Sequence, residues 1–182
     1  MKKLWIVALA LAFASALALA GCGGGGGSDA GSGSGLAQKD TGSFTIGVAD
    51  GWTAYDVTDP FSDDGVVDPD QLQIGKGTSS EIDLLSYPYL QVVYYKPGTT
   101  VLKDIQGWYE NVQEINDLTI GTNIWSGFEG DSYGYHWTVL FTGEQDGPQF
   151  QVSLSAGTKA DVTATIDDAD VREMIASLKV DA

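Results

Sequence analysis

Residues 89–95 read YLQVVYY, and residues 133–141 read YGYHWTVLF. Both stretches are rich in aromatic and β-branched side chains, which favour strands because they pack well on a pleated surface. Lys96-Pro97-Gly98 closes the first stretch with residues that form turns rather than continue a strand. The two stretches therefore predict strands of a β-sheet.

Five further segments have the pattern of strands. Residues 43–48 alternate apolar and polar side chains, as a half-buried strand does, and residues 52–57 follow across a turn at Ala49-Asp50-Gly51. The other predicted strands cover residues 120–125, 150–154 and 162–166. Glycine and proline in the intervening segments separate these strands, and most of them are expected to pair in antiparallel fashion.

Two stretches change to helical spacing. Apolar residues recur at steps of four, three, four and three and predict a helix, with Thr99 or Thr100 as its cap; they are Val101, Ile105, Trp108, Val112 and Ile115. A second helix is predicted from about Asp168 to Lys179, because acidic residues suit the positive end of its dipole. The expected fold is α+β, a mainly antiparallel sheet of about six or seven strands packed with two helices.

Composition and charge exclude several functional classes. The chain has 182 residues, with 25 acidic residues against 9 basic ones and a formal net charge of −16. No nucleic acid partner is expected, because recognition of phosphates needs a basic surface. The single cysteine and single histidine exclude an internal disulfide and any site that needs two histidines.

The first 21 residues have the layout of a secretory signal peptide. Lys2 and Lys3 precede an apolar run, and small residues follow it. Leu19-Ala20-Gly21-Cys22 resembles the lipobox of bacterial lipoproteins. That resemblance implies cleavage before Cys22 and acylation of its sulfur and amine, and two or three acyl chains suffice for stable anchoring. The expected location is the extracytoplasmic side of a bacterial cell membrane, with the lipid bilayer as a partner through Cys22.

A spacer and one domain are expected after the signal peptide. Residues 22–37 are rich in glycine and serine and behave as a flexible tether. Residues 38–182 form the predicted single acidic α+β domain, which is large enough to fold without a disulfide.

The predicted domain resembles the PsbP-like α/β/α sandwich. The resemblance rests on Phe44-x-Ile46 and Trp52, on a helix after the strand at 89–95, and on the closing sequence IASLK at 175–179. This family includes photosystem accessory proteins, a Ran-binding import factor and many bacterial lipoproteins. The resemblance implies an accessory, binding or assembly role, and it transfers no catalytic residues.

Carboxylates gather between residues 56 and 70, where they predict either a solvated acidic loop or an irregular calcium site. The EF-hand pattern fails, because Pro60 and Ser62 occupy positions that need oxygen ligands with carboxylate or amide groups. The candidate calcium ligands are Asp59, Asp63, Asp64, Asp68 and Asp70.

Aromatic residues are the other candidates for binding. Flat rings on an exposed face can stack on sugars of the cell envelope or contact a partner protein, whereas the alternative is that they fill the core. Adjacent tyrosines on a strand point to opposite faces, so one of each such pair must leave the core. The candidate ligand-binding residues are Tyr94, Tyr95, Trp125 and Trp137.

No catalytic constellation is evident. His136 lies in a strand-like segment, and a general base there would need an acid partner and a nucleophile supplied by the fold. The chain lacks the spacing of a P-loop. The prediction is a membrane-anchored, non-enzymatic binding or accessory module without a cofactor. Two alternatives stay open, an envelope-associated hydrolase built from carboxylates and His136, and a calcium-dependent adhesion or stability module.

Overall fold

The computed structural model describes residues 35–59 and 65–181 of the chain. The predicted signal peptide, Cys22 and most of the predicted tether lie outside these residues, as do Asp63 and Asp64. Within the described part, no helix is long and apolar enough to cross a membrane.

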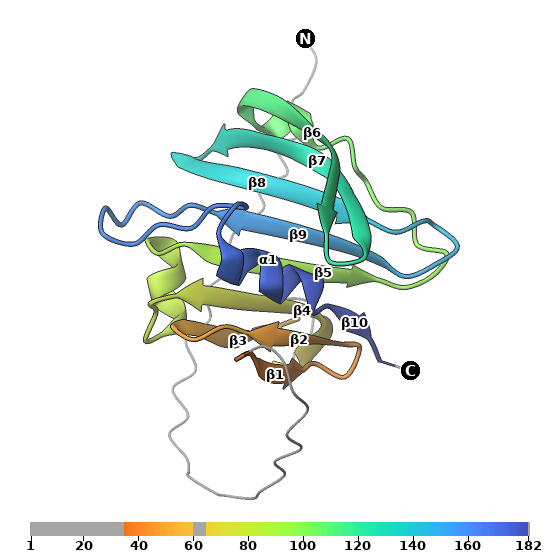
Figure 1. Cartoon of the computed structure of the whole chain (residues 1–182), viewed down its shortest axis with the longest axis horizontal. Helices are drawn as coiled ribbons and strands as arrows, with labels where there is room; N and C mark the ends of the chain where they lie inside the picture. The colour runs from red at the N-terminus through yellow and green to blue at the C-terminus, as the bar shows by residue number, and fades with distance from the viewer. Residues whose placement is uncertain (1–34, 60–64, 182) are drawn as a thin grey trace, which may run out of the picture.

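A seven-stranded antiparallel sheet forms the main part of the fold (Figure 1). All neighbouring strands in it run in opposite directions. The predicted strands at residues 89–95 and 133–141 correspond to β5 and β8, which are inner strands of this sheet. In spatial order the strands are β3 (Trp52–Thr58), β4 (Val67–Lys76), β5 (Tyr89–Tyr95), β9 (Gln149–Ser155), β8 (Tyr135–Thr142), β7 (Asn123–Ser132) and β6 (Glu110–Ile120).

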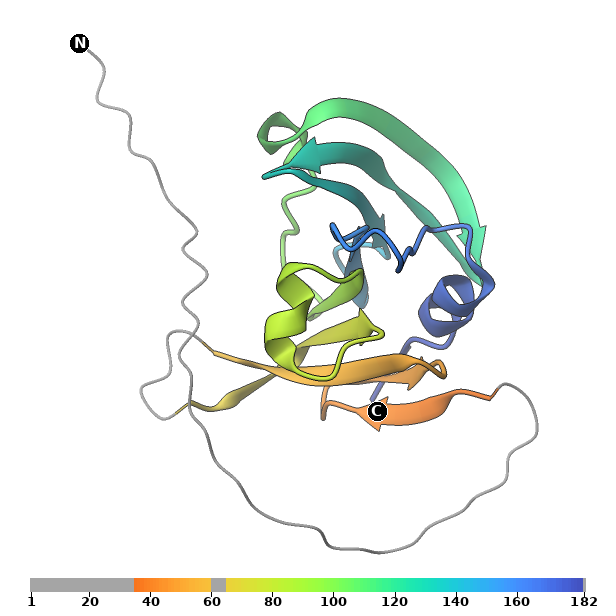
Figure 2. The same cartoon turned by 90° about the vertical axis from the view of Figure 1, so that its left-hand side faces the viewer.

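A second, three-stranded sheet lies beside the first (Figure 2). Its central strand is β2 (Phe44–Val48), which pairs with β1 (Ala37–Asp40) on one side and with β10 (Lys179–Val180) on the other. Ala37, the last residue of the predicted tether, is the first residue of β1 and pairs with Val48. The helix α1 (Ala169–Ala176) lies between the two sheets, and β6 and β7 curve over toward it in Figure 2.

Strand alternation explains the main core. Along β5 the burial of side chains alternates, so Leu90, Val92 and Tyr94 face inward while their neighbours face the opposite side of the sheet. Inward-facing side chains of β2, β4, β9 and α1 complete this cluster. The largest completely buried members include Trp125, Phe44, Ile46, Leu72, Ile74, Met174 and Ile175.

A smaller apolar cluster covers the other face of the large sheet. Phe128, Val139 and Phe141 are buried there, and Val101 and Ile105 pack against them. These last two residues belong to the connection between β5 and β6, which crosses this face and contains the 3₁₀ helix η2 (Gln106–Trp108). A second 3₁₀ helix, η1 (Glu81–Leu85), lies between β4 and β5.

The predicted helix over residues 101–115 is wrong. The apolar residues that suggested one helical face are divided, because Val101 and Ile105 cover the second cluster, Ile115 packs on the main core and Trp108 is exposed. From Glu110 onward the chain pairs with β7 as a β-strand. This pairing stabilises the segment more than a helix would, because its helix propensity is weak. The structure thus has one α-helix in its described part where two were expected.

Two predicted strands also differ. Residues 120–125 span a hairpin turn, in which Gly121 has a positive φ and ends β6. Residues 162–166 form no strand. The helix predicted near Asp168–Lys179 is confirmed in a shorter form, and the mainly antiparallel α+β class is confirmed as well.

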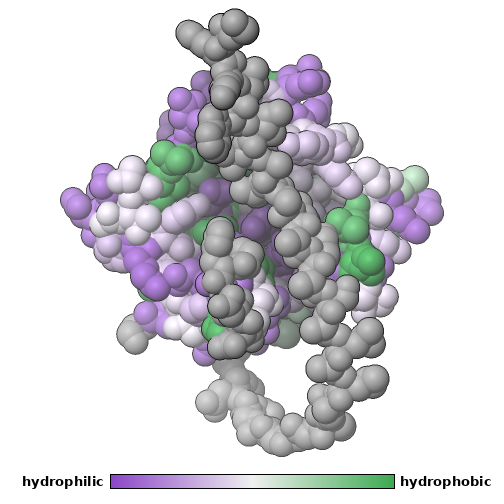
Figure 3. Space-filling view, turned by 180° about the vertical axis from the view of Figure 1, so that it is seen from behind, coloured by the Kyte–Doolittle hydropathy of each residue, from purple (hydrophilic) through white to green (hydrophobic). Residues whose placement is uncertain are grey.

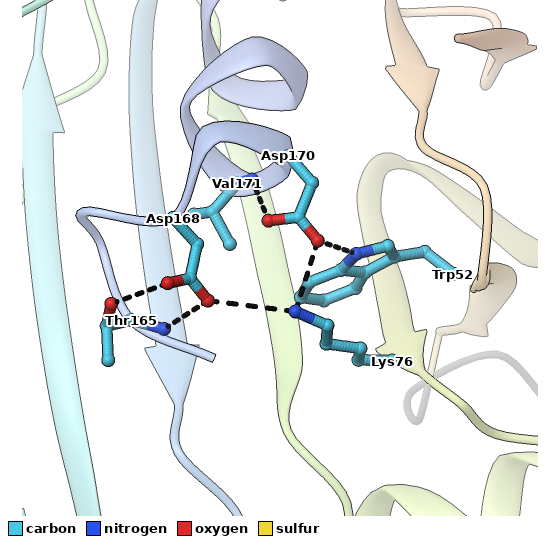
Figure 4. A network of polar contacts seen from close by, with 6 residues as sticks. All are labelled: Trp52, Lys76, Thr165, Asp168, Asp170 and Val171. Atoms are coloured by element: carbon cyan, nitrogen blue, oxygen red, sulfur yellow. Dashed lines mark hydrogen bonds and ion pairs between the residues drawn. The ribbon is translucent and has the colours of Figure 1, made fainter. Parts of the chain in front are cut away.

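Polar contacts fix the start of α1 on the large sheet (Figure 4). Asp168, the cap residue, accepts hydrogen bonds from the backbone and hydroxyl of Thr165. Lys76 of β4 lies 3.6 Å from Asp168 and 3.1 Å from Asp170. Trp52 of β3 donates from its indole nitrogen to Asp170. The helix is therefore held to β3 and β4 by charge-assisted contacts as well as by its buried apolar face.

Candidate functional site

An open hollow of about 370 Å³ lies where η2, the start of β6 and the β7–β8 hairpin meet. We call it the hairpin hollow. It is far from β1 and β2, because β6 and β7 form the opposite edge of the large sheet (Figure 1). Its lining consists of Trp108, Glu110, Asn111, Asp131, Ser132, Tyr133 and Gly134.

Two aromatic side chains of the hairpin hollow face solvent. Trp108 is 74% exposed and Tyr133 is 98% exposed. Neither ring belongs to the aromatic pairs found among the described residues, which involve other rings on the sheet and in the core. Because large aromatic side chains contribute most to folding when they are buried, two such exposed rings beside one hollow indicate a binding surface.

The conformation of Tyr133 is unfavourable for its residue type. Tyr133 and Gly134 form the two-residue turn between the paired residues Ser132 and Tyr135, with φ values of 53° and 82°. Such hairpin turns favour asparagine, aspartate or glycine, and a bulky residue with positive φ is uncommon. The strain costs about 1–3 kcal/mol. The strained backbone carries a ring that is 98% exposed, so neither the turn nor the core explains why this residue is a tyrosine. This combination supports a functional role for Tyr133.

Asp131 organises the polar part of the hollow. Its Oδ2 accepts a 2.7 Å hydrogen bond from Asn111, and its Oδ1 lies 2.9 Å from Nδ1 of His136. The hydrogen bonds from Asn111 and from His136 lower the pKa of Asp131 below its ordinary value. Asp131 is consequently ionised at neutral pH, and Nδ1 carries the proton in the contact with His136 because a carboxylate only accepts.

Strand register brings these residues together. Asp131 on β7 lies opposite His136 on β8 and opposite Glu110 on β6. Asn111 has a φ of 53° where the register between β6 and β7 shifts, and this irregularity places its amide against Asp131. The pairing of Asp131 with His136 follows from the two-residue turn at Tyr133-Gly134, which was not predicted as a turn, whereas Glu110 and Asn111 reach Asp131 through a strand about twenty residues away. Asp131, Asn111 and Glu110 were therefore not among the predicted site residues.

His136 lies between the hairpin hollow and a smaller cavity. That cavity, of about 70 Å³, is lined by His136, Glu129 and Thr138, among others. Thr138 donates a 3.3 Å hydrogen bond to Glu129. In the described part of the chain the side chain of His136 contacts Asp131, so the fold supplies an acid partner for the histidine. Residues 130–134 read GDSYG and have the Gly-x-Ser-x-Gly spacing, but they form the β7–β8 hairpin instead of a turn between a strand and a helix. Ser132 donates its hydroxyl to the backbone oxygen of Trp108 and not to His136.

The structure corrects part of the predicted aromatic surface. Trp125 is completely buried and Tyr94 is nearly so, because both lie on strand positions that face the main core. Tyr95 points to the opposite face, where its hydroxyl donates to Gln151. Trp137 is half-buried, with ring centroids 5.7 Å from Tyr89. The exposed ring of Trp108 was missed because the sequence assigned it to the core of a helix.

The acidic stretch is engaged with protein groups where it is described. Asp68 accepts hydrogen bonds from the backbone of Asp70 and from Gln71. Asp70 accepts from Ser43 and forms an ion pair with Lys96. Residues 35–59 and 65–181 contain no group of three histidine, cysteine or acidic side chains that could hold a metal ion. Asp63 and Asp64 lie outside the described residues, so the calcium hypothesis stays a prediction.

Exposed apolar residues also lie outside the hairpin hollow. In the space-filling view from behind, hydrophobic groups appear as separate patches at the two sides of a largely hydrophilic face (Figure 3). Large exposed apolar residues outside the hollow include Ile82, Leu102 and Ile124, which belong to different segments. Scattered exposed apolar residues are normal for a folded domain.

Comparisons with known proteins place no function on the chain. No family model matches it, and no curated protein matches it. A solved structure of a protein from Bacteroides thetaiotaomicron is similar, with 14% sequence identity and a TM-score of 0.44. The similarity covers 79% of this chain and 47% of the other, so this chain spans less than half the length of that protein.

Proposed function

We propose that this chain is an extracytoplasmic bacterial lipoprotein whose acidic domain is a non-enzymatic binding module. The anchor is Cys22, supported by the lipobox-like sequence Leu19-Ala20-Gly21-Cys22 after an apolar run. A Gly/Ser-rich spacer then leads to β1. Such a spacer lets a domain turn freely relative to the membrane while staying within reach of it.

The hairpin hollow is the binding site in this proposal, and the exposed pair Trp108 and Tyr133 is the observation that carries it. Flat rings stack on the apolar faces of sugar rings, while carboxylate and amide groups form hydrogen bonds with polar substituents. Glu110, Asn111 and Asp131 supply such groups in the same hollow. A glycan of the cell envelope is therefore the ligand class that fits best.

The fold is further proposed to be a variant of the PsbP-like sandwich. A seven-stranded antiparallel sheet and a helix near the C-terminus support this relationship, while the segment after β5 contains a 3₁₀ helix and a strand in place of the helix implied by the resemblance. The resemblance favours an accessory or binding role over catalysis.

Tryptophan fluorescence tests the binding site. The detergent-purified mature protein is titrated with an N-acetylglucosamine trimer and a glucosamine trimer, and Trp108→Ala should weaken binding of whichever trimer binds by at least roughly tenfold, equivalent to about 1.4 kcal/mol. Leu102→Ala is the matched control, because Leu102 is 76% exposed but does not line the hairpin hollow. Equal affinities of the two variants for a bound trimer, or no binding of either trimer, would refute the proposed site.

Metabolic labelling tests the anchor separately. Radiolabelled palmitate should enter the wild-type protein and not a Cys22→Ala variant, and mass spectrometry should find an acylated cysteine as the first residue. Incorporation of label into both proteins would remove Cys22 as the acylation site. A protein without label would remove the lipoprotein assignment and leave the binding test unaffected.

A hydrolase is the second candidate, and the Asp131–His136 contact is the observation that favours it. A histidine held by a carboxylate can act as a general base toward water. In that case His136→Ala should abolish hydrolysis of an envelope glycan while leaving its binding in place. Unchanged hydrolysis, or none in the wild type, would leave binding as the function.

A further inference from the structure

We propose that the hairpin hollow selects a positively charged ligand, specifically a sugar that carries a free ammonium group. This inference rests on the proposed binding function and specifies its ligand class. It follows from the charge of the lining, from the balance of hydrogen-bond donors and acceptors in it, and from the two exposed rings.

The lining carries negative charge without a basic side chain. Glu110 and Asp131 are direct cross-strand partners in the register of β6 and β7. Like charges in that position repel one another and destabilise a sheet. No lysine or arginine lines the hollow, and the ion pairs found within residues 35–59 and 65–181 include none to Glu110. A cation bound between the two carboxylates would remove this repulsion.

The hollow offers carboxylate acceptors, and two of its polar side chains already donate to protein groups. The amide of Asn111 already donates to Asp131, and the hydroxyl of Ser132 donates to the backbone oxygen of Trp108. Each carboxylate oxygen has capacity for a second bond, and Glu110 has both of its oxygens available. These carboxylates favour a ligand that brings donors, and an ammonium group brings three of them.

The exposed rings favour the same ligand. A cation over the face of an aromatic ring is attracted by the ring quadrupole, and tryptophan is the strongest partner for it. Trp108 and Tyr133 border the acidic part of the hollow. Rings and carboxylates together recognise an ammonium-bearing sugar, since its apolar face stacks while its charge meets Glu110 and Asp131. The predicted domain, with 24 acidic and 7 basic residues between 38 and 182, also attracts cations from a distance.

Two trimers that share a sugar backbone, one with free amino groups and one with acetylated amino groups, test the inference. A trimer of glucosamine and its fully N-acetylated counterpart share one skeleton, and at about pH 6.5 the free amines are mostly protonated. The mature protein should bind the glucosamine trimer at least tenfold more tightly in about 0.02 M salt, and the preference should shrink in about 0.2 M salt because ions screen the attraction.

Variants then locate the preference. Glu110→Gln should reduce the ratio of the two affinities toward one, whereas Glu114→Gln should leave the ratio unchanged, because Glu114 lies on the same strand outside the hollow. Both positions are exposed, so both variants should fold, which equal melting temperatures would verify.

Each result is decisive. Tighter binding of the N-acetylated trimer, still weakened by Trp108→Ala, would overturn the charge preference and leave the proposed binding function in place. An equal effect of Glu110→Gln and Glu114→Gln would assign the preference to the general charge of the domain and overturn the role of the hollow. Failure of both trimers to bind would overturn this inference together with the glycan-binding proposal.

Discussion

The indole nitrogen of Trp52 donates a 2.8 Å hydrogen bond to Asp170, which lies 118 positions later in the chain. The same carboxylate oxygen lies 3.1 Å from the ammonium of Lys76, and this ammonium lies 5.4 Å from the centre of the Trp52 ring (Figure 4). Three residues from β3, β4 and α1 thus form one contact. This contact holds α1, near the end of the described chain, against β3 and β4, which come more than 90 residues earlier.

Removal of this contact should destabilise the fold. We expect Asp170→Ala to lower the free energy of unfolding by about 1–2 kcal/mol, because it deletes hydrogen bonds to a charged group that is partly shielded from solvent. Urea denaturation measures the change. Asp167→Ala is the control, since Asp167 is 85% exposed in its ion pair with Arg172 and should contribute little. A larger effect at Asp167 would contradict this explanation.

The same carboxylate should make stability depend on acid pH. Burial alone would raise the pKa of Asp170, but hydrogen bonds from Trp52 and Lys76 and the charge of Lys76 bring it below its ordinary value. A lowered pKa in the folded state gives stability that is present above the unfolded value, near 3.9, and is lost as pH falls through the folded value. The advantage of wild type over Asp170→Asn in free energy of unfolding should therefore shrink as the pH falls below the unfolded value, as measured by urea denaturation at several pH values.

Alkaline pH should act through Tyr89. Burial, together with the nearby phenols of Tyr135 and Tyr109, raises its pKa to about 12. This shift contributes roughly 2–3 kcal/mol to the free energy of unfolding. The contribution is complete below the unfolded-state pKa near 10 and is lost as the pH rises to about 12. Tyr89→Phe should reduce the dependence of the free energy of unfolding on pH between about 10 and 12, as measured by urea denaturation. Tyr133→Phe, at a ring in solvent, should follow the wild-type profile.

Stability and binding should separate at Tyr133. Tyr133→Asn replaces a strained residue by one that accepts a positive φ, so the free energy of unfolding should rise by about 1 kcal/mol. The same change removes an exposed ring from the hairpin hollow and should weaken ligand binding several-fold. Calorimetric unfolding and fluorescence titration measure the two effects. A variant with unchanged affinity would exclude Tyr133 from the binding site.

Gly127 should tolerate no side chain. A Cβ atom there would overlap the backbone oxygen of Val139 on the neighbouring strand. We expect Gly127→Ala to cost at least about 3 kcal/mol, because two paired backbones would have to separate. Gly107→Ala is the control, since nothing lies within 4 Å of a Cβ at that position. Equal melting temperatures of the two variants would contradict the close approach of β7 and β8.

The sequence was sufficient to predict strands in which apolar and polar residues alternate and a turn follows. The strand at residues 89–95 was placed with its observed bounds, because alternating burial and a closing Pro-Gly are both visible in the sequence. The segment after it was misassigned because the helical spacing of its apolar residues arose by chance, and its partner strand β7 was unknown. β4 was missed because the acidic stretch concealed its start.

The candidate site depends on information that no local pattern contains. Exposure of Trp108 follows from the path of the β5–β6 connection, and the pairing of Glu110 with Asp131 follows from the register of β6 and β7. One local signal was available, since Tyr133 precedes a glycine in the short segment between two strand patterns. A bulky aromatic residue in a tight hairpin turn is unusual enough to deserve notice in a sequence alone.

β1 and β10 flank the same strand, β2, so the described chain enters and leaves at one pole of the molecule (Figure 2). The hairpin hollow lies beside the start of β6, the edge strand of the large sheet that is farthest in strand order from β3. A domain suspended from either terminus would therefore hold its hollow outward. A reporter or surface fixed to residue 35 or to residue 181 would leave ligand access unobstructed.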